Sequence, residues 1–423
     1  SFIYIDISSI DNNTNKITNP KHYIGKDAPS RARQLIRKDD ILFSTVRTYL
    51  KNIAYVPKTY DKQIASTGFS VLRAEENIDP KFLFYYCLTQ EFLEPLNNLQ
   101  RGTSYPAVRE GDVRSQPFPL PPFHEQISIV EKIEELFSQL DAGVAGLKRA
   151  KVKLKRYRAS VLKAAFKGRL IPQDPNDEPA LEVLRRMGKE SLKSDDLIPL
   201  PENWVWTTLG SVTQPERNRV QPGDYPNAKY IGMADVESTT MKLLRTRFAS
   251  EMKSTAETFK AGDVLYGSLR PYLNKVISPQ FDGLCSTEFI VFPKSSHLNN
   301  DYLRIFLNTT VFVAYSTSRN TGDRPRVKFE QFQDYPFPYP PMEEQERIVN
   351  TLEKHFSIIQ SFDDMIAENF DRTQNIKRAI LSRAFEGKLI RGKQFSPKEI
   401  IDVNEKPENA KEQNAYIQES LLK

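Results

Sequence analysis

The sequence has 423 residues, of which 39% are hydrophobic and 27% charged, with a formal net charge of +6. This composition indicates a globular protein of two or three domains, and no apolar run approaches the roughly 20 residues that span a bilayer. Cys87 and Cys285 are too few for a disulfide framework or a four-cysteine zinc site, and no signal peptide is visible, so we expect a cytoplasmic protein.

The first predicted domain covers residues 1–120. It combines a β-rich run, Ile41–Val46, with a helical stretch, Pro80–Leu96, and its turns are rich in Gly, Pro, Asn and Asp. This pattern predicts an α+β fold. Compared with the second domain, it lacks about thirty residues before Tyr4, so we expect its beginning to be incomplete.

Residues 121–170 predict one long spacer helix. Two prolines precede its first turn, and Gly168 lies where a helix would stop. Its apolar residues recur at alternating intervals of three and four, which is typical of a coiled-coil seam. The predicted seam residues are Val130, Ile133, Phe137, Leu140, Val144 and Leu147.

The same order then repeats. A linker with a short helix (171–197) leads to a second α+β domain (198–339) and a second spacer helix (340–390). A polar tail, 391–423, follows and is expected to be poorly ordered. The second seam comprises Val349, Leu352, Phe356, Ile359, Ile366 and Phe370.

The repeat is explicit in the sequence. Phe-Pro-Leu-Pro-Pro-Phe-His-Glu-Gln at 118–126 returns 219 residues later as Phe-Pro-Tyr-Pro-Pro-Met-Glu-Glu-Gln at 337–345. The match continues without a gap to Ala-Phe-Lys-Gly-Arg-Leu-Ile at 165–171 and Ala-Phe-Glu-Gly-Lys-Leu-Ile at 384–390. The domains match more loosely than the helices, which indicates two divergent copies on a common framework.

Charge predicts how the helices pair. Each begins acidic and ends basic, so an antiparallel pair sets every acidic half beside a basic one, whereas a parallel pair aligns like charges. We therefore predict antiparallel helices joining two α+β domains.

Arginine and aromatic residues gather at loop-like positions in both domains. Arginine forks suit guanine edges and phosphates, and Ser or Thr hydroxyls suit phosphates. The candidate DNA contacts are Arg47, Tyr49, Ser66, Thr67, Arg101, Tyr105 and Arg109 in the first domain, and Arg270, Tyr272, Thr287, Arg319, Arg324, Arg326 and Lys328 in the second. For any single one of them, an ordinary surface role is the simpler explanation.

Catalytic motifs are missing from the sequence. The Pro-Pro pairs lack the acidic or amide residue of an amino-methyltransferase, and neither a glycine-rich AdoMet loop nor a phosphate-binding loop occurs. Asp235 with Glu251-Met252-Lys253 resembles a nuclease motif only weakly, because such a match is frequent by chance. We expect no catalytic, cofactor or metal site in this chain.

Two unlike domains, each followed by Phe-Pro-x-Pro-Pro-x-x-Glu-Gln and a long helix, resemble the specificity subunits of type I restriction–modification enzymes. The resemblance also includes Leu200-Pro201-Glu202-Asn203-Trp204 and the segment from Gly262 to Leu273. It implies that each domain recognises one half of a split, asymmetric site on double-stranded DNA, with the helices setting the spacer. It further implies two modification subunits that carry AdoMet, restriction subunits that use ATP and Mg²⁺, and no membrane association.

The sequence leaves two alternative hypotheses open. One is a single-chain endonuclease or methyltransferase with a cryptic site, and the other is a coiled-coil scaffold that binds only protein.

Overall fold

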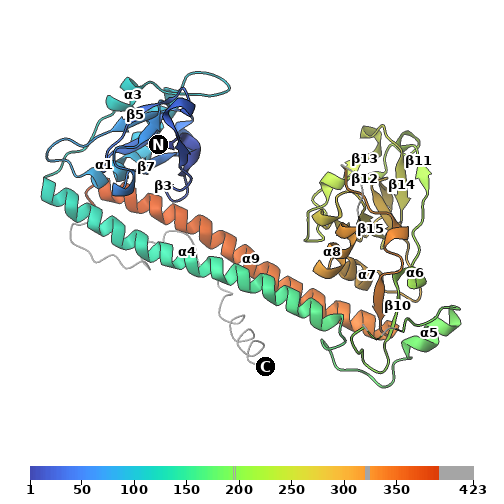
Figure 1. Cartoon of the computed structure of the whole chain (residues 1–423). Coiled ribbons are helices and arrows are strands. Elements are labelled where there is room, and N and C mark those ends of the chain that lie inside the picture. Colours follow the sequence, from blue (N-terminus) through green and yellow to red (C-terminus); the bar gives the residue numbers. More distant parts are fainter. Residues whose placement is uncertain (194, 196, 320–323, 390–423) are drawn as a thin grey trace. The chain divides into compact units, whose positions relative to one another are not determined.

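A computed structural model describes residues 1–193, 195, 197–319 and 324–389. The predicted tail, 391–423, lies outside these residues. The described part of the chain divides into two compact units, one of residues 1–148 with the chain from Ile366 onward and the other within Arg149–Met365 (Figure 1). Each unit contains one α+β domain and part of both long helices.

The first unit, unit 1, contains two small sheets. One has the strand order β4-β1-β8-β5, and the other has the order β7-β6-β9. The strands are β1 (Phe2–Ile5), β4 (Lys21–Tyr23), β5 (Ala32–Leu35), β6 (Ile41–Ser44), β7 (Ile53–Tyr55), β8 (Ile64–Ser66) and β9 (Phe69–Leu72). The short hairpin β2 (Ile10–Asp11) and β3 (Lys16–Ile17) completes the set.

The helical stretch predicted at Pro80–Leu96 is two helices. α1 (Pro80–Cys87) ends before Thr89, whose hydroxyl accepts from the Phe92 N–H and caps α2 (Gln90–Asn98). The second domain has the same division, because Thr309 caps α8 (Thr310–Ser318) after α7 (Asn300–Leu307). In each domain, a helix-favouring run is interrupted by a side chain that competes for backbone donors.

The second unit, unit 2, repeats this plan. Its sheets have the orders β11-β14-β17-β12-β13 and β16-β15-β18, and β10 pairs with β19 separately. The strands are β10 (Val205–Thr208), β11 (Arg219–Val220), β12 (Lys229–Ile231), β13 (Arg247–Phe248), β14 (Ala256–Phe259), β15 (Val264–Gly267), β16 (Val276–Ile277), β17 (Gly283–Ser286), β18 (Phe289–Phe292) and β19 (Pro336–Tyr339). The linker carries α5 (Ala180–Arg186), and α6 (Leu209–Val212) follows β10.

Both predicted spacer helices are present, although each is shorter than its predicted range. α4 spans Phe123–Ala165 and α9 spans Met342–Phe385, so each is about 65 Å long at 1.5 Å per residue. In unit 1, Ile133 near the start of α4 shares a core with Ile380 near the end of α9. In unit 2, Val161 near the end of α4 shares a core with Val349 near the start of α9. The helices are therefore antiparallel, as charge predicts.

Every predicted seam residue is buried or half-buried. The seam is nevertheless not a simple two-helix contact. Val130 and Ile133 belong to a core that includes Phe82 of α1, and the Phe137 ring packs edge-on against Tyr85 at 5.8 Å. The start of each helix therefore contributes to its domain as well as to the helix pair.

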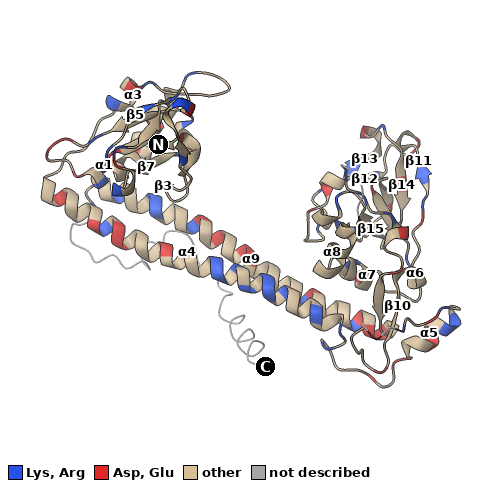
Figure 2. Cartoon of the chain, viewed as in Figure 1, with Lys and Arg blue, Asp and Glu red and all other residues tan. Residues whose placement is uncertain are grey.

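The charged residues of the helices are divided between two kinds of partner. Asp141 pairs with Lys377 across the helices at 2.6 Å, as the antiparallel prediction requires. Glu134 instead pairs with Lys81 of α1, and Glu353 with Arg304 of α7, both at 2.7 Å. Figure 2 shows how acidic and basic positions are distributed along α4 and α9. Some of the acidic residues thus attach the domains to the helices.

The repeated Glu-Gln motif explains how each domain is fixed to its helix. The Gln126 amide is fully buried; its oxygen accepts from the Asp79 N–H, and its nitrogen donates to the Asn77 and Pro121 carbonyls. Gln345 does the same in unit 2, accepting from the Asn299 N–H. Asp79 and Asn299 are the caps that begin α1 and α7, so one glutamine in each unit positions the helical layer of the domain.

Among the residues described, no helix has the length and apolar character needed to cross a bilayer. Cys87 and Cys285 are buried free thiols, and burial raises the pKa of each above its ordinary value.

Candidate nucleic-acid interface

Three chain segments meet at one face of unit 1. The Thr45 N–H and hydroxyl both donate to the Gly68 carbonyl at 3.0 Å, which ties the end of β6 to the β8–β9 turn. The Val108 N–H donates to the Thr45 carbonyl at 2.9 Å, and the Arg47 N–H donates to the Pro106 carbonyl at 2.7 Å. Segments 45–51, 66–68 and 101–109 therefore form one surface, which we call face 1.

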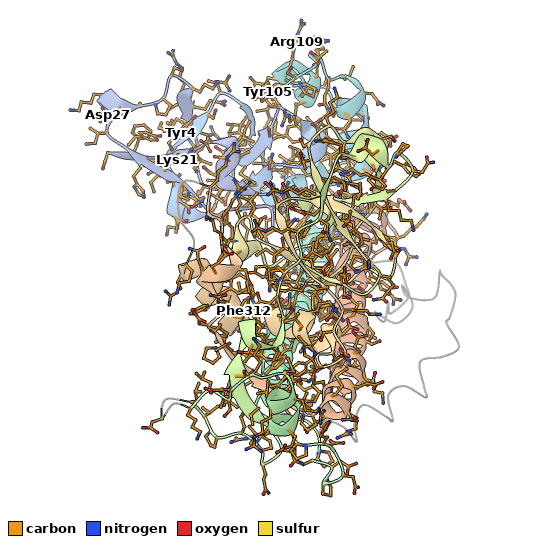
Figure 3. The ribbon with its side chains drawn as sticks, turned by 90° about the vertical axis from the view of Figure 1, so that its right-hand side faces the viewer. Tyr4, Lys21, Asp27, Tyr105, Arg109 and Phe312 are labelled. Atoms are coloured by element: carbon orange, nitrogen blue, oxygen red, sulfur yellow. The ribbon has the colours of Figure 1, made fainter. Side chains whose placement is uncertain are left out.

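Arg47 lies at the centre of face 1. Its backbone is left-handed, with φ 49°, which is a costly conformation for a residue with a side chain. Its guanidinium donates to the Ser104 carbonyl at 2.9 Å and lies 4.8 Å from the ring centroid of Tyr105. Tyr105 is 72% exposed, and Tyr105 and Arg109 both lie at the upper edge of the unit (Figure 3).

Unit 2 builds the same surface, which we call face 2, from segments 268–274, 286–288 and 324–328 together with Arg319. The Ser268 N–H donates to the Glu288 carbonyl at 2.8 Å, and the Val327 N–H donates to the Ser268 carbonyl at 3.1 Å. The Arg270 N–H donates to the Pro325 carbonyl at 2.7 Å, and Arg270 is again left-handed, with φ 51°. The geometry of this loop is thus shared by both units.

The structure brings the predicted candidates together in two groups, one on each face. Those exposed to solvent are Tyr49, Thr67, Arg101, Tyr105, Arg109, Arg270, Tyr272, Thr287, Arg319, Arg324, Arg326 and Lys328. Arg47 is half-buried under Tyr105, and Arg326 pairs with Glu288 at 3.1 Å. Ser66 is the exception: it is buried, and its hydroxyl accepts from the Gly68 N–H, so it shapes the turn.

Face 1 and face 2 are chemically suited to DNA. Exposed guanidinium groups and tyrosine rings on loops supply charge-assisted donors and flat apolar contacts, and hydroxyls such as Thr67 and Thr287 supply phosphate donors. Three hydrogen-bonded segments hold the loops in place, which lowers the ordering cost of binding.

Sequence reasoning missed a second cationic group beside each face. In unit 2, Arg245 and Arg247 both donate to Oδ1 of Asp235, at 2.7 and 3.1 Å. In unit 1, Lys21 donates to Asp6 at 2.6 Å. Burial alone would raise the pKa of Asp235, but hydrogen bonds from Arg245, Gly232 and Arg247 outweigh burial and hold that pKa below its usual value.

The nuclease motif considered for Asp235 does not fit its surroundings. Asp235 is fully buried and bound by two arginines, and Glu251 accepts from the Phe248 N–H. No group of three or more His, Cys, Asp or Glu residues in the described part of the chain could hold a metal ion.

Comparison with known proteins agrees with this architecture. Residues 2–148 and 201–366 match a family model described as the type I restriction modification DNA specificity domain. The EcoDI type I restriction enzyme specificity subunit of Escherichia coli is 28% identical over 311 residues, which cover 72% of this chain and 70% of that protein.

Two solved structures are also similar. A chain from a structure of a type I R-M system is 28% identical, with a TM-score of 0.72 and 92% of each chain covered. The HsdS subunit from Thermoanaerobacter tengcongensis is 29% identical, with a TM-score of 0.52 and coverage of 92% of this chain and 90% of that one. Since the family match covers both domains and most of the two helices, the chain belongs to the type I restriction–modification DNA specificity family.

Proposed function

We propose that this chain is the DNA-reading subunit of a type I restriction–modification enzyme. Face 1 reads one half of a bipartite, asymmetric site on double-stranded DNA, and face 2 reads the other. The observation that carries this proposal is the pair of faces: both have the same hydrogen-bonded loop framework, yet they display different side chains.

The shared framework and the differing side chains have separate roles. Arg47 and Arg270 occupy the same left-handed position in both units, so they suit a contact that both half-sites offer, such as phosphate. The residues that differ, such as Arg101 to Arg109 against Arg319 to Lys328, suit recognition of different bases.

The helices act in this proposal as a spacer. Half-sites one duplex turn apart are separated by roughly 34 Å, which fits within helices of about 65 Å. Their length then sets the number of base pairs between the half-sites.

Catalysis belongs, in this proposal, to partner proteins. Two modification subunits carry AdoMet, restriction subunits use ATP and Mg²⁺, and the outer surfaces of the helices bind them. The chain itself supplies recognition and no chemistry, which the lack of catalytic motifs in the sequence supports.

Two assays separate this proposal from its alternatives. The purified full chain, incubated with DNA, Mg²⁺ and AdoMet, should neither cleave nor methylate the DNA. Turnover would show that the chain is itself an endonuclease or methyltransferase. In an electrophoretic shift with random-sequence duplex DNA, alone and with the modification subunit, the chain should retard the duplex, whereas a protein-only scaffold would not.

Exchange of a domain tests the assignment of half-sites. Replacing residues 198–336 with the equivalent domain of another family member should change one half-site and preserve the other, as measured by methylation profiling of host DNA. A change in both halves would contradict independent reading.

A further inference from the structure

A buried carboxylate lies beside face 2. β12 runs parallel to β17, with Ile231 opposite Cys285, so the residues after Ile231 lie next to Ser286 and Thr287. Asp235 stabilises the turn that follows β12, because its Oδ2 accepts from the Gly232 N–H at 2.9 Å. The Lys275 ammonium donates to the Met233 carbonyl, and the Asn274 carbonyl accepts from the Thr239 N–H. The segment after β12 therefore lies next to two segments of face 2, the one that contains Arg270 and the one that contains Thr287.

The two arginines bound to Asp235 differ in what they leave free. Arg247 donates through Nε and one terminal nitrogen, and its side chain is 32% exposed. Arg245 donates through Nε alone, and its side chain is 63% exposed. Among the described residues, the terminal nitrogens of Arg245 have no hydrogen-bond partner. They face solvent, while the hydrogen bond from Nε to Asp235 fixes the side chain.

This arrangement leaves an uncompensated positive charge in a fixed orientation. Asp235 carries one negative charge, and its Oδ1 accepts from both guanidinium groups, so it can neutralise only one of the two positive charges. The pair therefore keeps one positive charge in excess, and Arg245 is the more exposed of the two arginines. An arginine held at Nε keeps the pair of terminal N–H groups that forms a bidentate contact with O6 and N7 of guanine.

The same position in unit 1 carries a different residue. The Leu244 N–H donates to the Asp235 carbonyl, and the Thr18 N–H donates to the Ser9 carbonyl, so Thr18 corresponds to Leu244 and Asn19 to Arg245. Strand pairing agrees, since Lys21 lies opposite Tyr4 as Arg247 lies opposite Tyr230. The cation at the position of Arg247 is thus retained in unit 1 as Lys21. The position of Arg245 is occupied in unit 1 by Asn19.

We infer that Arg245 is a specificity-determining residue that reads a guanine in the major groove of the half-site bound by face 2, with Asp235 as its positioning residue. The inference rests on the proposed function and adds a base-reading residue to it. Asn19 at the equivalent place suits adenine rather than guanine, which agrees with two half-sites of different sequence.

The test compares Arg245→Gln with a matched control in the same sheet. Arg219 on β11, at the opposite edge, is also an exposed arginine held at Nε by a buried carboxylate, Glu257, at 3.2 Å. Full-length wild-type chain, R245Q and R219Q, each assembled with the modification subunit of its own system, select duplexes from a randomised pool. The enriched sequences and the salt dependence of binding are then measured.

R245Q should lose preference for guanine at one base pair of one half-site, by about tenfold, and leave every other position unchanged. R219Q should select the wild-type motif. If R245Q keeps the wild-type motif and binds all sequences more weakly, with a salt slope reduced by about one, Arg245 contacts phosphate and the inference is wrong. If the wild-type chain enriches no motif, the proposed function fails first, and the inference fails with it.

Discussion

At the scale of single residues, the repeated Glu-Gln pair shows how one motif has two roles. The glutamine is buried in both units and binds the backbone at the first turn of a domain helix. The glutamate differs: Glu344 is buried and accepts from the Trp204 indole at 2.9 Å, whereas Glu125 is exposed. Tryptophan and Gln173 reach the carboxylate only in unit 2 among the residues described.

Removing the buried glutamine should destabilise unit 1. Gln126→Ala leaves the Asp79 N–H and two carbonyls without a partner inside the protein, at a cost of about 2–3 kcal/mol. Gln139→Ala, on the exposed side of the same helix, is the matched control and should change stability by less than about 0.5 kcal/mol. Urea denaturation measures both, and equal stability of the two variants would contradict the role given to Gln126.

The pKa of Glu344 predicts a pH-dependent stability. Burial raises this pKa above its ordinary value of 4.5, although hydrogen bonds from Trp204 and Gln173 oppose the rise. The folded protein therefore holds the proton more tightly than the unfolded chain. The ionised carboxylate costs folding free energy above the raised pKa, and this cost disappears as the pH falls below about 4.5.

Glu344→Gln should therefore be more stable than wild type at pH 8, by a margin that narrows as the pH falls towards 4.5. The new amide oxygen can still accept from Trp204. Its NH₂ can donate to the Gln173 oxygen, which is buried without a partner, once the Gln173 amide turns over. Unfolding free energies measured across this pH range check the trend. A constant difference between the two proteins would show that the charge of Glu344 has no part in it.

At the scale of elements, the two long helices end in the same way but in different surroundings. Gly168 and Gly387 both have a left-handed backbone, with φ 64° and 72°. A Cβ on Gly168 would lie 2.3 Å from the ring of Pro201, whereas a Cβ on Gly387 would have no described residue within 4 Å. The repeat therefore provides a pair of sites with equal backbone geometry and unequal packing.

Alanine at the two glycines should separate these effects. Gly387→Ala should lower the free energy of unfolding by about 1 kcal/mol, which is the strain of a side chain in the left-handed region. Gly168→Ala should cost about 1–3 kcal/mol more, because Pro201 must move. Denaturant midpoints give both values. Equal losses of stability in the two variants would mean that Pro201 moves aside without strain.

At the scale of the whole molecule, both helices contribute to both units. Each unit takes the first half of one helix and the second half of the other into its core. A change in the length of one helix alone would shift its seam relative to its partner. A change in both by whole heptads preserves the seam.

Lengthening both helices should lengthen the DNA spacer. One heptad inserted after Lys148 and one after Met365 adds about 10.5 Å of helix, equivalent to about three base pairs. Methylation profiling should then find the same two half-sites separated by about three more base pairs. Recoding an existing heptad without changing its length is the control, and an unchanged spacer in the longer protein would rule out the helices as the determinant of spacing.

The sequence by itself determined the repeat, the two helices, their antiparallel direction and the loops that carry the candidate contacts. These follow from local signals: heptad spacing, prolines and glycines at helix ends, and the distribution of charge along each helix. The two-helix division of 80–98 was missed because Thr89 looks like any polar residue until its hydroxyl caps α2. The predicted DNA contacts remain predictions.

Only the tertiary structure decided which residues meet. It joined three distant segments into each face, buried Ser66 in a turn, and paired Glu134 and Glu353 with the domains. It also placed Arg245 and Arg247 on one buried carboxylate, which the sequence presented only as a weak nuclease match. Spacing along the chain reports periodicity, whereas the partner of a charge depends on how strands and loops far apart in sequence pack together.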